Sequence, residues 1–128
     1  MLHLEPTVKN AHVLVVDDDA AIRKALKFGL ETEGLVVKTF SGGRQMLESG
    51  SVNQADCLVL DCRMAGMDGF AVVAELAARK ARIPVILMTA PVTETMRRRA
   101  REAGVFSLLE KPLLDGALAE NIRQATAA

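Results

Sequence analysis

The chain has 128 residues, half of them hydrophobic, so it is long enough to bury the core of one domain. Its 16 basic and 16 acidic residues cancel, and this balance gives no support for direct binding to nucleic acid or to an anionic membrane. The apolar runs are too short to cross a bilayer, and the first ten residues lack the basic start and apolar stretch of an export signal. We therefore expect a cytoplasmic protein with an N-terminal extension over 1–10 and a single domain over 11–128.

Five short apolar runs along the chain predict five β-strands. Each run is apolar throughout instead of alternating with polar residues, as in strands that are covered on both faces. The pattern therefore predicts a parallel sheet, with strands at 12–16, 35–40, 57–60, 84–89 and 106–109.

Segments with apolar residues at helical spacing separate these strands. The first runs from Ala20 to Glu33 and ends before Gly34, which is suited to a left-handed cap. Ser41 is suited to capping a short second helix that ends near Glu48. The remaining helices are expected at 69–78, at 93–103 and from about Asp115 onward.

This alternation of strands and helices predicts a doubly wound α/β fold. Right-handed crossovers place helices on both faces of a five-stranded parallel sheet. In such folds the chemistry lies at the carboxyl ends of the strands, so the residues that follow each strand are the candidates for a site.

Polar residues suited to phosphoryl transfer follow four of the predicted strands. Residues 17–19 are three aspartates, and Asp61 follows the third strand. Clustered carboxylates repel one another unless a divalent cation binds them, and oxygen ligands suit Mg²⁺ or Mn²⁺. An aspartate can act as the nucleophile toward phosphorus. The hydroxyl of Thr89 and the ammonium of Lys111 would hold the phosphoryl oxygens.

Four motifs at these strand ends resemble those of the receiver domain of bacterial two-component response regulators. The motifs are VLVVDDD at 13–19, LVLDCRMAGMDG at 58–69, VILMTA at 85–90 and EKP at 110–112. The resemblance covers residues 12–125 and implies a flavodoxin-like sheet with strand order 2-1-3-4-5. It is greatest for the FixJ-type branch, whose receiver precedes a helix-turn-helix DNA-binding domain and regulates transcription.

The resemblance also implies a role for each residue of the metal and phosphoryl-acceptor site. Asp61 would receive a phosphoryl group from a sensor histidine kinase. Asp18 and Asp61 would bind Mg²⁺ directly, Asp17 directly or through water, and Arg63 through its backbone carbonyl. The domain would catalyse only its own phosphorylation and dephosphorylation.

Further residues of the resembling family would bind the phosphoryl group and move with it. Thr89, Ala90 and Lys111 are the expected phosphoryl-binding and switch residues, and the peptide bond from Lys111 to Pro112 is commonly cis. The resemblance implies that the switch changes the face formed by helix four, strand five and helix five. This face often forms homodimers through charged pairs, and the predicted fourth helix carries Arg97, Arg98, Arg99 and Arg101.

Three residues depart from the family pattern. Leu108 stands where an aromatic side chain normally follows the inward motion of Thr89, and Phe106 lies two positions earlier on the same side of the strand. Ala65 replaces a common proline, and Pro91 replaces a residue that is often polar. These departures concern the relay to the output face and the rate of dephosphorylation.

Two alternative functions fit parts of the sequence. A haloacid-dehalogenase-type phosphatase would use Asp17 as the nucleophile and Asp19 as the acid, but it would leave Asp61 without a role. A pseudo-receiver would keep the fold and act without phosphorylation. On a purely structural interpretation Asp19 caps a helix, and Gly66 and Gly69 are turn glycines.

Overall fold

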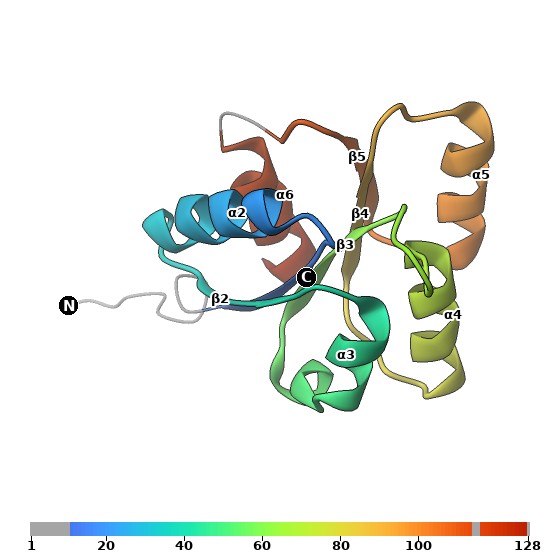
Figure 1. Cartoon of the computed structure of the whole chain (residues 1–128), viewed down its shortest axis with the longest axis horizontal. Helices are drawn as coiled ribbons and strands as arrows, with labels where there is room; N and C mark the ends of the chain where they lie inside the picture. The colour runs from blue at the N-terminus through green and yellow to red at the C-terminus, as the bar shows by residue number, and fades with distance from the viewer. Residues whose placement is uncertain (1–10, 114–115, 128) are drawn as a thin grey trace.

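The computed structural model describes residues 11–113 and 116–127, and the predicted extension over 1–10 lies outside this range. Five parallel strands form one sheet in the order β2-β1-β3-β4-β5, as predicted (Figure 1). The strands are β1 (His12–Val16), β2 (Val36–Phe40), β3 (Cys57–Asp61), β4 (Val85–Thr89) and β5 (Ser107–Glu110). Their bounds differ from the predicted ones by one residue at most.

Helices cover both faces of the sheet (Figure 1). The helices and one short 3₁₀ helix are α2 (Ala20–Thr32), α3 (Gly43–Glu48), η1 (Ser51–Gln54), α4 (Gly69–Ala78), α5 (Glu94–Ala103) and α6 (Ala117–Ala127). Side chains of α2 and α6 pack in one apolar cluster, and those of α3, α4 and α5 pack in the other. The predicted start of the last helix at Asp115 lies outside the described residues.

Residues of the central strands alternate between the two apolar clusters. In β1, Val13 and Val15 face the α2 and α6 side, whereas Leu14 and Val16 face the opposite side. All five residues of β3 and of β4 are buried. Because a helix layer lies on each side, both faces of these strands are apolar.

The edge strands are less buried than their apolar sequences indicate. Val36 and Lys38 of β2 are exposed, and no residue of β5 is fully buried. The prediction that every strand is covered on both faces was therefore wrong for β2 and β5. An edge strand has a neighbour on one side only, so the helix layers cover it incompletely.

The helix ends follow the predicted caps with one exception. The Asp19 side chain accepts hydrogen bonds from the backbone N–H groups of Ala21 and Ile22, and Gly104 ends α5 with a φ of 76°. Ser41 does not cap α3, because Gly42 occupies that position. The backbone N–H and hydroxyl of Ser41 instead contact Oε1 of Gln45. None of the helices in the described residues is long and apolar enough to span a bilayer.

Candidate functional site

The parallel sheet brings the predicted acidic residues together at its carboxyl edge. Asp17 and Asp18 follow β1, and Asp61 is the last residue of β3. One carboxylate oxygen from each lies within 4.8 Å of the others. Asp17 and Asp61 are buried and Asp18 is exposed, so the cluster has a buried floor and an open side.

Lys111 extends from the end of β5 into this cluster. Its Nζ lies 2.9 Å from Oδ2 of Asp17 and 3.2 Å from Oδ2 of Asp61. The remaining oxygens of both acids accept backbone hydrogen bonds, from Asp19 to Asp17 and from Arg63 to Asp61. One cation thus lies between two buried carboxylates, and the site carries a net negative charge.

The ionisation of the site reflects this balance of burial and charge. Burial raises the pKa of Asp61 above its ordinary value, and the negative charge of Asp17 adds to this effect. The N–H of Arg63 and the ammonium of Lys111 oppose it. Burial alone would lower the pKa of Lys111, but its contacts with Asp17 and Asp61 outweigh burial and raise that pKa, so Lys111 is a cation at neutral pH.

Thr89 is the last residue of β4 and is buried, and it follows Met88, which pairs with Asp61 of β3. Its Oγ1 accepts a hydrogen bond of 3.4 Å from Nε of Arg63. The next residue, Ala90, is exposed at the rim of the site. Two peptide bonds near these residues are cis: the predicted one before Pro112, and one before Pro91 that was not predicted.

The two residues expected to relay the switch lie in and beside β5. Leu108 is half-buried and packs against the apolar cluster on the α5 side. Phe106 precedes β5 and is 45% exposed. Both line a hollow of about 200 Å³ whose other side includes Arg97 and Arg101 of α5.

Two contacts that support the site were missed at the sequence level. Nη1 of Arg23 donates a hydrogen bond of 2.8 Å to the backbone carbonyl of Asp17. Gly69 is the first residue of α4, as predicted, but its close approach to β3 was not predicted. A Cβ at Gly69 would lie 2.6 Å from the backbone oxygen of Asp61 and 2.9 Å from Cα of Cys62. Its spacing after Asp61 was the available signal for this close approach.

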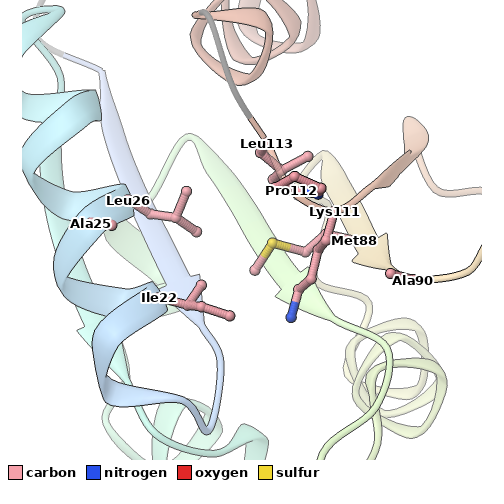
Figure 2. Close-up of a pocket in the computed structure, with 8 residues that line it drawn as sticks. All are labelled: Ile22, Ala25, Leu26, Met88, Ala90, Lys111, Pro112 and Leu113. Atoms are coloured by element: carbon pink, nitrogen blue, oxygen red, sulfur yellow. The ribbon is translucent and has the colours of Figure 1, made fainter.

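An apolar hollow of about 430 Å³ opens beside the acidic cluster. Figure 2 shows Ile22 and Leu26 of α2 on one side and Lys111 with the residues after it on the other. The remaining lining residues are Ala25, Met88, Ala90, Pro112 and Leu113. Every lining residue except Lys111 is apolar, and the ammonium of Lys111 contacts the acidic cluster.

The chemistry of the cluster is that of oxygen ligands for a hard divalent cation. Three carboxylates close together suit Mg²⁺ or Mn²⁺ better than zinc, because the cluster offers neither sulfur nor imidazole. Beside them stand a hydroxyl and an ammonium that can bind phosphoryl oxygens.

Comparisons with known proteins match this arrangement. The family model of the response regulator receiver domain matches residues 13–123. Nodulation protein W of Bradyrhizobium diazoefficiens is 36% identical over 124 residues, which are 97% of this chain and 54% of that protein. Transcriptional regulatory protein FixJ of Azorhizobium caulinodans is 37% identical over 111 residues, 87% of this chain and 53% of that protein. The chain therefore spans about half the length of these relatives.

Solved structures of similar proteins have the same fold. The structure titled FixJ-N has a TM-score of 0.82 at 31% identity and covers 92% of this chain and 94% of its own. The response regulator StyR has a TM-score of 0.81 at 37% identity, over 92% of this chain and 60% of its own. From the strand order, the acidic cluster and these matches, the chain belongs to the response regulator receiver domains of two-component signalling and is FixJ-like.

Proposed function

We propose that this domain is a phosphorylation-operated switch that accepts a phosphoryl group on Asp61 from a sensor histidine kinase. The observation that carries the proposal is the position of the Asp61 carboxylate. It ends β3 within 4.8 Å of the oxygens of two further aspartates, and it lies 3.2 Å from the Lys111 ammonium. A nucleophile, a set of metal ligands and a cation for the phosphoryl oxygens thus meet at one point.

Mg²⁺ is the cofactor that fits this donor set, and Mn²⁺ would fit the same ligands. The side chains of Asp17, Asp18 and Asp61 and the backbone carbonyl of Arg63 would hold it. When bound, the ion offsets the negative charge of the carboxylates and of the incoming phosphoryl oxygens.

The reaction is an in-line displacement at phosphorus. A carboxylate oxygen of Asp61 forms the new P–O bond as the P–N bond to the kinase histidine breaks, and the bonding electrons return to the imidazole. Lys111 exchanges its contact with Asp61 for a phosphoryl oxygen, and the Thr89 hydroxyl donates to another. Hydrolysis of the acyl phosphate later restores Asp61, so the domain catalyses only its own modification.

The donor kinase would dock on the apolar hollow beside Asp61. A phosphohistidine must approach Asp61 from the carboxyl edge of the sheet, and the hollow between α2 and the segment after β5 opens there. Ile22, Ala25 and Leu26 present apolar surface from α2. Such a surface fits the apolar face of a helix from the kinase.

The output would be transcriptional control by a domain joined to this receiver. The FixJ and NtrC relatives are named as transcriptional regulators, and the chain spans only part of them. Phosphorylation would change the face formed by α5, β5 and α6 and favour a homodimer through that face. We place the protein in the cytoplasm and assign no direct nucleic-acid contact to this domain.

Phosphate uptake tests this proposal against the pseudo-receiver alternative. With acetyl phosphate and Mg²⁺, we expect an acid-stable, base-labile phosphate that maps by mass spectrometry to Asp61. Asp61→Asn should take up none, while its circular dichroism stays that of the parent. Label on Asp17 would favour the phosphatase alternative, and a parent that neither takes up phosphate nor binds beryllofluoride would be a pseudo-receiver.

A further inference from the structure

The side chain of Arg63 makes a contact that phosphoryl acceptance does not require. Its Nε donates to Oγ1 of Thr89 over 3.4 Å, while its backbone N–H donates to Oδ1 of Asp61 over 3.1 Å. Arg63 is exposed and Thr89 is buried. A solvent-exposed cation on the loop after β3 is therefore joined to the buried hydroxyl at the end of β4.

We propose that this contact is a latch for the unphosphorylated state, a role that rests on the proposed function of Asp61. Arg63 holds the Thr89 hydroxyl in place until a phosphoryl group on Asp61 offers a stronger partner. Thr89 then turns to a phosphoryl oxygen, and Arg63 is released. Arg63 is thus a positioning residue that acts through Thr89.

The hydrogen-bond geometry supports an exchange between two partners. Within residues 11–113 and 116–127, the Arg63 contact is the only side-chain hydrogen bond of Thr89 Oγ1. Lys111 is instead bonded to the two aspartates. A distance of 3.4 Å is at the outer limit for a hydrogen bond. A change to another staggered rotamer of Thr89 would move Oγ1 and break the contact.

After its release, the Arg63 side chain would turn into a neighbouring hollow. A hollow of about 460 Å³ lies between α4 and α5 and is lined by Cys62, Arg63, Met64, Asp68, Phe70, Met96 and Arg99. Asp68 is the only carboxylate on that lining, and a guanidinium binds a carboxylate well. The neighbouring Arg99 is already stacked over the ring of Phe70 at 4.1 Å. The released guanidinium would therefore turn to Asp68.

This movement gives a route to the output face that does not pass through β5. The hollow that receives Arg63 also touches Met96 and Arg99 of α5, and α4 and α5 lie on the same side of the sheet (Figure 1). A change in the position of the Arg63 side chain thus reaches α5 directly. The absence of an aromatic side chain at Leu108 then does not interrupt the signal.

Nuclear magnetic resonance of the Thr89 methyl group tests the latch in the parent, Arg63→Ala and Arg44→Ala. Arg44 is an exposed arginine of α3 that lies outside this hollow and outside the face formed by α5, β5 and α6, so its removal is matched in charge. Without ligands, Arg63→Ala should move the Thr89 signal toward its position in the parent bound to beryllofluoride and Mg²⁺. It should also tighten beryllofluoride binding about two- to tenfold, because one competing hydrogen bond is lost. Arg44→Ala should do neither.

A double-mutant cycle separates the latch from a general effect of charge. The gain from Arg63→Ala should persist in Thr89→Ser, which keeps the hydroxyl, and vanish in Thr89→Ala. An unmoved Thr89 signal, or weaker beryllofluoride binding in Arg63→Ala, overturns the latch alone when the parent binds normally. A parent that binds no beryllofluoride overturns the proposed function and the latch with it.

Discussion

At the level of single residues, Asp61 is a buried acid held by one cation and repelled by a neighbouring acid. Lys111 lies between Asp61 and Asp17 and contacts both, so one positive charge offsets two negative ones. Burial raises the pKa of Asp61, which means that the charged carboxylate costs stability in the folded state. The proposed phosphoryl acceptor is thus also a local source of instability.

Asp61→Asn should therefore stabilise the fold in the absence of Mg²⁺. Between the ordinary carboxyl pKa of 3.8 and the raised folded value, the folded state binds more protons than the unfolded state, so parent stability falls as pH rises. Urea unfolding should show that Asp61→Asn raises the free energy of unfolding at neutral pH, on the order of 1 kcal/mol as for other single stabilising substitutions, and the gain should disappear below pH 3.8. Glu48→Gln, which changes an exposed acid of α3, should show no such dependence. A constant gain at all pH values would mean that the ionised carboxylate of Asp61 is not its cause.

At the level of elements, the approach of α4 to the end of β3 positions the backbone of Asp61. Gly69 begins α4, and its Cα hydrogen occupies the space where a Cβ would meet the Asp61 carbonyl. The helix can therefore pack closer to β3 than a helix with any side chain at that residue. The positions of Asp61 and Arg63 depend on this spacing.

Gly69→Ala should destabilise the protein by about 1 to 3 kcal/mol, since α4 must shift away from β3. It should also weaken beryllofluoride binding, because the shift displaces Asp61. The matched change is Gly29→Ala in α2, where a Cβ meets nothing within 4 Å and helix propensity favours alanine by about 1 kcal/mol. Thermal unfolding of the two variants should move in opposite directions. Equal stability of Gly69→Ala and the parent would contradict the close approach.

The proposed docking of the kinase on the apolar surface of α2 can be tested by substitution. Ala25→Gln adds a neutral, polar side chain to the hollow beside Asp61 and should slow phosphotransfer from a phosphorylated histidine kinase about tenfold. Transfer from acetyl phosphate should keep its rate, since no acidic-cluster residue changes. Ala74→Gln on the exposed side of α4 is the matched control and should leave both rates unchanged. An equal loss with both donors would place the effect in the acidic cluster instead of at a docking surface.

At the level of the whole molecule, the acidic cluster joins the ends of β1 and β3, so the proposed binding of a metal there would raise global stability. Mg²⁺ at 100 times its dissociation constant should raise the free energy of unfolding by about 2.7 kcal/mol. A chelator should reverse this gain in a thermal melt. Asp18→Ala should abolish it by removing an exposed ligand, while Asp56→Ala, an exposed acid outside the cluster, should retain it. A Mg²⁺ gain that persists in Asp18→Ala would assign the binding to another site.

The residues of the candidate site could be predicted because each lies at the end of an apolar run. Asp17, Asp61, Thr89 and Lys111 lie at the ends of four different strands, and a parallel sheet brings all carboxyl ends to one edge. The contacts of Lys111 with Asp17 and Asp61 bear out this reasoning. The roles of Arg63 as a metal ligand and of Leu108 and Phe106 as a relay stay predictions.

The sequence by itself determined the order of elements, the parallel sheet and the meeting of the acidic residues at one edge of that sheet. The spacing of apolar residues and the residues at strand ends are local properties of the chain. Only the tertiary structure decided which strands are exposed at the sheet edges and how closely Gly69 approaches Asp61. It also decided that Arg63 meets Thr89, 26 residues away. These features depend on distances between packed elements and on side-chain rotamers, which no local pattern in the sequence encodes.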